Sequence, residues 1–98
     1  MIETHPQGPE AIRSRRDLAC ALTVLRLSAG LSVRELAMRL DVPVATIGDY
    51  FSGRHLPGPS RFPLLRRVLA ECGVVDDLVA QRWLLAVAAL KRQPAAGT

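Results

Sequence analysis

Residues 31–53 read Leu-Ser-Val-Arg-Glu-Leu-Ala-Met-Arg-Leu-Asp-Val-Pro-Val-Ala-Thr-Ile-Gly-Asp-Tyr-Phe-Ser-Gly, and this stretch decides the fold. Ser32 and Glu35 have the spacing of a capping box, in which both side chains accept backbone hydrogen bonds at the start of a helix. Apolar residues then recur at helical spacing until Asp41, a residue type that tolerates the left-handed conformation of a sharp turn. Pro43 suits the first position of a second helix, and Gly53 suits its end. The pattern predicts two short helices joined by a tight turn, which is a helix-turn-helix.

The stretch and its flanks resemble the lambda-repressor/Cro-like (XRE-type) domains, in the version found at the N-terminus of actinobacterial multidomain proteins. The resemblance covers roughly residues 17–90 and implies an all-α fold, a compact five-helix bundle with a helix-turn-helix. It also implies the DNA-binding domain of a transcriptional regulator, although helix-turn-helix folds serve as protein-interaction modules too. The matching residues are Gly30-Leu31-Ser32, Arg34-Glu35-Leu36-Ala37, Val42-Pro43, Thr46-Ile47 and Ser52-Gly53-Arg54-His55-Leu56-Pro57.

The composition indicates one helical domain with an excess of positive charge. The chain has 98 residues, of which 49% are hydrophobic and 4% aromatic, a mixture that favours packed helices over a sandwich or barrel. The net charge of +4 fits a polyanionic partner such as nucleic acid, and it fits equally a need for solubility. No signal peptide is evident and no apolar run is long enough to span a bilayer. We therefore expect a cytoplasmic protein with no membrane partner, associated with the nucleoid if it binds DNA.

The chain divides into three expected parts. Residues 1–15 are expected to form a flexible N-terminal arm, residues 16–92 the helix-turn-helix domain, and residues 93–98 a C-terminal tail or linker. Besides the two short helices, the apolar periodicity predicts helices over about 16–29, 60–72 and 77–92. Trp83 is expected to fill the core. The linker-like composition of the C-terminal residues suggests the N-terminal module of a longer protein.

No catalytic or metal-binding constellation is evident in the sequence. The two histidines, His5 and His55, fall in segments predicted to be irregular, and the acids fall at turns or caps. Cys20 and Cys72 form no CxxC pair, so buried, reduced thiols are the simplest interpretation. The sequence therefore predicts a protein that is not an enzyme and that has no cofactor and no metal site.

Double-stranded DNA is the partner that the resemblance implies, with the second short helix in the major groove. That helix offers Val44, Ala45, Gly48 and Asp49 to the bases and lacks the Arg, Lys, Asn or Gln that usually read purine edges. Binding would then depend mostly on phosphate contacts, including those of a stiff, proline-rich loop after the helix. A further candidate set, just before the first expected helix, is Arg13, Arg15 and Arg16. The predicted DNA-binding residues are Arg34, Val44, Ala45, Thr46, Asp49, Arg54, His55 and Arg61.

A second hypothesis is that the fold serves as a protein-interaction or oligomerisation module with little or no DNA binding. Val24 and Leu27 fall away from the core stripe of the first helix, and Leu84 and Leu85 add to surplus apolar surface on the last one. These four residues are the predicted protein interface, with a homodimer mate or a neighbouring domain as the partner. The resemblance and the basic charge favour DNA over this alternative.

Overall fold

A computed structural model describes residues 9–92, and within that range every regular element is helical. The expected all-α, five-helix bundle with a helix-turn-helix is confirmed. The expectations for residues 1–8, including His5, and for residues 93–98 lie outside the described residues. The elements are η1 Pro9–Ala11, α1 Arg15–Ser28, α2 Val33–Leu40, α3 Val44–Ser52, η2 Pro59–Arg61, α4 Phe62–Glu71 and α5 Asp77–Arg92.

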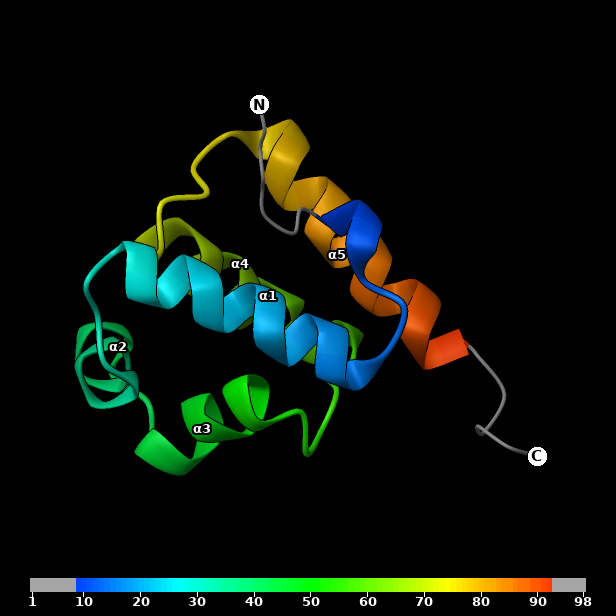
Figure 1. The fold of residues 1–98 in the computed structure, drawn as a ribbon. Coiled ribbons are helices and arrows are strands. Elements are labelled where there is room, and N and C mark those ends of the chain that lie inside the picture. Colours follow the sequence, from blue (N-terminus) through cyan, green and yellow to red (C-terminus); the bar gives the residue numbers. More distant parts are fainter. Residues whose placement is uncertain (1–8, 93–98) are drawn as a thin grey trace.

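The helices pack around α1, which runs through the middle of the molecule (Figure 1). α3 packs against α1 and α2, while α5 packs against α4 and η1 along the other edge. The helix-turn-helix therefore lies on one side of the bundle and α5 on another. The buried core draws on every α-helix, and its most fully buried side chains are Leu22, Leu36, Ile47, Leu65, Val68, Leu69 and Val87.

Side-chain caps begin three of the helices where the sequence places Ser or Asp. The Glu35 N–H donates to Ser32 Oγ at 3.0 Å, and the Ser32 N–H donates to Glu35 Oε1 at 2.8 Å, so the capping box is confirmed. Ser14 Oγ accepts from the Asp17 N–H at 3.0 Å at the start of α1. Asp76 caps α5 in the same way. Each cap satisfies backbone donors that have no partner inside the helix.

Left-handed residues end α2 and α3, as the sequence predicts. Asp41 has φ 58° at the end of α2, and Gly53 has φ 76° at the end of α3. A Cβ at position 53 would also lie 3.4 Å from the Arg15 carbonyl oxygen, so glycine lets the end of α3 approach α1 closely. Pro43 stands one position earlier than expected, because it is the N-cap of α3 and not its first helical residue.

The segment before α1 differs from the expected free arm over its described part. Pro9–Ala11 form the short 3-10 helix η1, which packs against α5 and α1. Ile12 is buried and joins the core cluster. The physical reason is that burying an isoleucine side chain is favourable by roughly 1.5–3 kcal/mol, enough to hold a short segment against the bundle.

Two smaller expectations are also corrected. The fourth helix begins at Phe62 and not near Ser60, because residues 59–61 form the 3-10 turn η2 first. Proline at positions 59 and 63 fits this arrangement, since each occupies an early helical position where no backbone N–H is needed. Cys20 is exposed, whereas Cys72 is buried as expected. Trp83 is buried in the core, which confirms its predicted role.

Candidate nucleic-acid interface

α3 has one side in the core and one side open to solvent. Ile47 and Tyr50 are buried, which fixes the rotation of the helix about its own axis. Val44 in the first turn is 44% exposed, Ala45 beside it is also exposed, and Asp49 one turn later is half-buried. The outer side of α3 therefore presents the small and apolar residues that the sequence assigns to it.

Four of the predicted DNA-binding residues come together in one hollow. Thr46 and Asp49 from α3 line it with His55 and Arg61, which follow α3 in the chain, and the hollow has a volume of about 310 Å³. Tyr50 also lines the hollow from the core side. The fold thus places a hydroxyl, a carboxylate, an imidazole and a guanidinium within one small concave surface next to the exposed side of α3.

Hydrogen bonds hold the start of the loop after α3. Ser52 Oγ donates to the Asp49 carbonyl oxygen at 3.2 Å and accepts from the Arg54 N–H at 3.1 Å. Arg15 Nη1 donates to the Arg54 carbonyl oxygen at 3.3 Å, which ties the loop to the first turn of α1. These bonds to α3 and α1 therefore fix the backbone position from which the exposed Arg54 side chain projects.

The other predicted contacts lie outside this hollow. Arg34 is exposed in the first turn of α2, and Arg54 is exposed at the start of the loop. Val44 lines a second hollow at the turn of the helix-turn-helix, together with Met38, which is 74% exposed. The sequence interpretation missed Met38. The sequence could have indicated it, because Met38 lies in α2 between the core positions Ala37 and Leu40, and helical spacing then places it on the outward side.

Tyr50 is a second residue that the sequence described only in part, because its burial was predicted and the surroundings of its hydroxyl were not. Its ring is buried as expected, but within residues 9–92 its hydroxyl has no hydrogen-bond partner. Burial raises the pKa of Tyr50 above its ordinary value, and the nearby Arg61 guanidinium opposes that rise. The phenol therefore stays neutral at the base of the hollow, beneath the side chains that face solvent.

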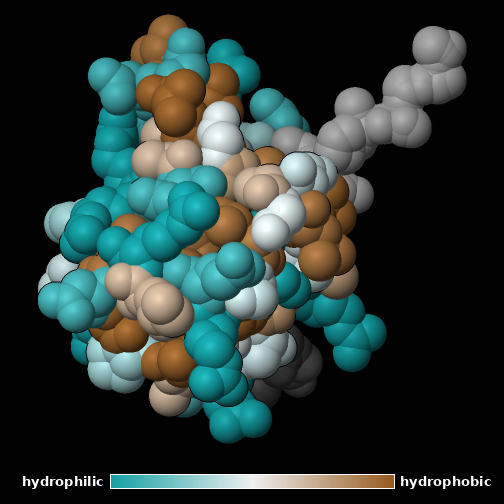
Figure 2. Space-filling view, turned by 90° about the vertical axis from the view of Figure 1, so that its left-hand side faces the viewer, coloured by the Kyte–Doolittle hydropathy of each residue, from teal (hydrophilic) through white to brown (hydrophobic). Residues whose placement is uncertain are grey.

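The predicted protein-interface residues are spread over two helices. Val24 and Leu27 are exposed on α1, and Leu85 is exposed on α5. Leu84 is half-buried and packs against the core, so it is the least available of the four. Seen from the side of α2 and the start of α3, hydrophobic residues form small areas separated by hydrophilic ones (Figure 2). That side of the molecule carries no single wide apolar patch.

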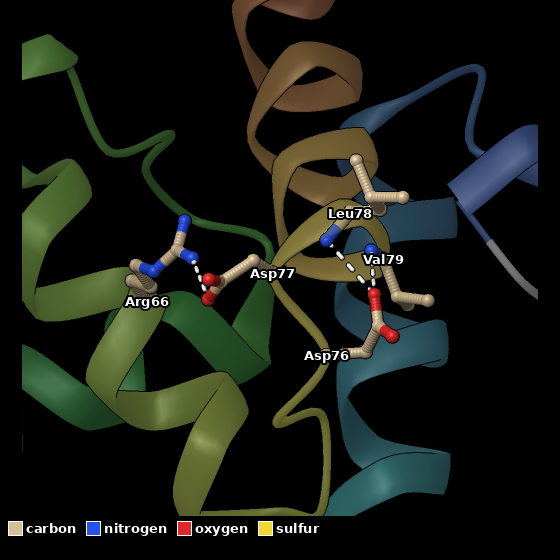
Figure 3. A network of polar contacts seen from close by, with 5 residues as sticks. All are labelled: Arg66, Asp76, Asp77, Leu78 and Val79. Atoms are coloured by element: carbon tan, nitrogen blue, oxygen red, sulfur yellow. Dashed lines mark hydrogen bonds and ion pairs between the residues drawn. The ribbon is translucent and has the colours of Figure 1, made fainter.

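The arginines differ in whether an acid neutralises them. Arg34, Arg54 and Arg61 have no acidic partner within 4.0 Å in the described part of the chain. Other arginines do, and Figure 3 shows one such pair at the junction of α4 and α5, beside the Asp76 carboxylate that caps α5. The ion pairs are Arg39–Glu71 at 3.1 Å, Arg66–Asp77 at 2.6 Å and Arg82–Glu10 at 3.7 Å.

Residues 9–92 hold no group of three or more His, Cys, Asp or Glu side chains that could bind a metal ion. None of the helices of the described chain has the length and apolarity that a membrane crossing requires. The concave, arginine-bearing surface beside α3 is thus the candidate site with the clearest chemistry.

Comparison with known proteins adds one finding. A protein-family model described as a helix-turn-helix domain matches residues 17–81, which is more than half of the chain. The match begins at the third residue of α1, takes in α2, α3 and α4, and ends after the first turn of α5. No curated protein and no solved structure matches the chain.

Proposed function

The chain belongs to the helix-turn-helix domain family, and from that premise we propose that it is the DNA-binding domain of a transcriptional regulator. One observation carries the proposal, namely that Arg61 and His55 stand with Thr46 in one concave surface beside the exposed side of α3. Phosphate groups flank the major groove, so a helix that enters the groove brings adjacent basic residues to the backbone. We assign α3 to the major groove and the segment that follows it to the phosphates.

Unneutralised charge supports the phosphate contacts. Arg34, Arg54 and Arg61 are exposed and carry no ion pair within residues 9–92. A guanidinium without an acidic neighbour keeps its full attraction for phosphate, whereas a paired one has to be separated from its acid first. Thr46 and His55 add hydrogen-bonding groups at the same surface. These contacts would supply most of the affinity for DNA of any sequence.

The outer side of α3 limits how DNA sequence is read. Val44 and Ala45 can pack against a thymine methyl group, and Asp49 can accept from the amino group of cytosine. No side chain of α3 offers the paired hydrogen bonds that select a guanine or an adenine. We therefore propose weak direct readout, supplemented by the shape and deformability of the DNA. A DNA target places the action of the protein in the cytoplasm, at the nucleoid.

The experiment is a fluorescence-anisotropy titration of the protein with a random-sequence duplex at low salt. Arg54→Glu and Arg61→Glu are each expected to weaken binding about tenfold, because each removes one phosphate contact and adds a repulsive charge. Arg66→Glu is the matched control, since it makes the same charge change at a residue paired with Asp77. It is expected to have a much smaller effect.

Equal affinity in the wild-type protein, Arg54→Glu and Arg61→Glu would reject the proposed phosphate contacts. A wild-type protein that binds no duplex even at low salt would reject DNA binding as a whole. The exposed Val24 and Leu27 favour the second candidate function, a protein-interaction module. In that case Val24→Glu and Leu27→Glu would abolish capture of a partner while Arg54→Glu would not.

A further inference from the structure

A further hollow lies between α1 and the end of α3. The two helices pack against each other (Figure 1), and a Cβ at Gly53 would already lie 3.5 Å from the Ala19 Cβ. Beside this close approach, the helices border an open groove with a volume of about 700 Å³. A volume of this size is enough to hold one small organic molecule. We call it the α1–α3 groove.

The walls of the α1–α3 groove are mainly apolar. Ala19 and Val24 line it from α1, and the half-buried Phe51 lines it from α3. The Arg26 guanidinium lies 5.2 Å from the centre of the Phe51 ring, and its Nη1 donates to the Leu31 carbonyl oxygen at 2.8 Å. Because that hydrogen bond holds the guanidinium, the cation–π contact holds the ring in place. An apolar molecule can therefore pack against a wall that is already formed.

One end of the α1–α3 groove carries two positive charges. Arg15 and Arg16 line it from the first turn of α1, and in the described part of the chain neither has an acidic partner within 4.0 Å. Asp17, the acid of the same turn, does not line the groove, and its carboxylate accepts from the Arg13 N–H at 2.9 Å. Two unneutralised guanidinium groups complement the charge and the paired oxygens of a carboxylate.

The charged end and the far apolar wall are separated along α1. Val24 stands eight residues after Arg16, a distance of about 12 Å at the rise of an α-helix. A small inorganic anion would occupy only the charged end and leave the apolar walls in water. A carboxylate attached to fused aromatic rings would cover both, and its rings would find an aromatic partner in Phe51.

We propose that the α1–α3 groove binds a small aromatic carboxylate, with its charge on Arg15 and Arg16 and its rings against Val24 and Phe51. The exposed Cys20 lines the groove between these two ends, so a bound ligand would cover its thiol. The groove shares no lining residue with the hollow beside the exposed side of α3. The proposal therefore does not rest on the proposed DNA binding.

The test measures the rate at which iodoacetamide alkylates Cys20 while 2-naphthoate is added in the absence of DNA. Peptide mass spectrometry follows the reaction, and the buried Cys72 is the internal reference. We expect the rate to fall to a plateau with a dissociation constant of about 1 mM, as for other ligands of this size. The neutral 2-naphthalenemethanol has the same rings without the charge, so it should bind at least about tenfold more weakly.

A pair of arginine variants checks where the carboxylate binds. Arg16→Gln should raise the dissociation constant of 2-naphthoate about tenfold, because it removes one charged donor. Arg34→Gln is the matched control, since it makes the same change in the first turn of α2, outside the groove, and should leave the constant unchanged. Arg16 is chosen over Arg15 because Arg15 Nη1 also donates to the Arg54 carbonyl oxygen.

Four other results would each overturn the proposal. The first is an alkylation rate of Cys20 that 2-naphthoate leaves unchanged up to about 10 mM. The second is equal protection by 2-naphthalenemethanol, which would mean that the arginines select no carboxylate. The third is equal protection by inorganic phosphate, which would assign both arginines to a phosphate. The fourth is protection that rises with protein concentration alone, which would mean that a second copy of the chain covers the groove.

Discussion

α3 and α5 present exposed surfaces of opposite character. The outer side of α3 carries small apolar and polar residues, and we propose that its affinity for DNA comes from arginines in other segments, such as Arg34 and Arg54. The outward side of α5 carries the exposed aliphatic side chains of Leu78 and Leu85. The first surface therefore suits a polyanion, whereas the second suits an apolar contact.

The largest expected effect separates the two faces of α5 itself. Trp83→Ala should lower the free energy of unfolding by about 3–5 kcal/mol, because it empties a buried site in the core. Leu85→Ala should change it by no more than about 0.5 kcal/mol in the monomer, because its side chain faces solvent. Urea denaturation at low protein concentration measures both. Similar losses for the two variants would mean that Leu85 belongs to the core.

Salt should have the next largest effect, and it should act on the surface beside α3 far more than on the core that includes the inner side of α5. If Arg34, Arg54 and Arg61 each neutralise one phosphate, a tenfold increase in salt should weaken duplex binding by about 500-fold, from a slope of about −0.9 per phosphate. The free energy of unfolding should change far less over the same range, since the core that Trp83 fills is apolar and carries no charge to screen. Anisotropy for the duplex and urea denaturation of the free protein, at matched salt concentrations, measure the two. Duplex binding that weakens by less than about tenfold would contradict three phosphate contacts.

The local structure that these surfaces depend on could be predicted where neighbouring residues determine it. The capping box of Ser32 and Glu35, the left-handed Asp41 and the stop at Gly53 each follow from side chains that act within a few residues. The start of α5 was predicted for the same reason, because Asp76 and Asp77 favour the N-terminus of a helix. Burial of Trp83 follows from its large apolar area.

Features that depend on the packing of distant segments could not be predicted. Ile12 is a lone apolar residue among polar ones, so no periodicity marks its place in the core. Leu84 and Leu85 are neighbours on a helix with apolar residues on more than one face, and only packing against α4 and η1 separates the half-buried one from the exposed one. The hollow beside α3 likewise depends on how residues 55–61 fold back toward the helix.

Asp49 should limit DNA binding by a smaller amount than salt does. Its carboxylate lines the hollow with Arg61, where it would repel an approaching phosphate. Asp49→Asn should therefore strengthen duplex binding by about threefold to tenfold at low salt. Asp76→Asn is the control, since it removes the same charge at the start of α5 and asparagine still caps a helix. If Asp49→Asn weakens binding instead, its carboxylate accepts a hydrogen bond from the DNA.

The smallest expected effect concerns the cap of α2, which holds the first half of the helix-turn-helix. The Ser32 backbone N–H and hydroxyl both stabilise the Glu35 carboxylate, which lowers the pKa of Glu35 below its ordinary value of 4.5. A carboxyl group whose pKa is lower in the folded state contributes stability above its unfolded pKa and loses it as the pH falls through the folded pKa. The wild-type protein should therefore be more stable than Glu35→Gln near pH 7, and the difference should shrink below about pH 4.5.

Urea denaturation at a series of pH values measures this difference. Ser32→Ala, which leaves the carboxylate in place, serves as a comparison. A constant difference between the wild-type protein and Glu35→Gln at all pH values would mean that the charge of Glu35 makes no contribution to the cap.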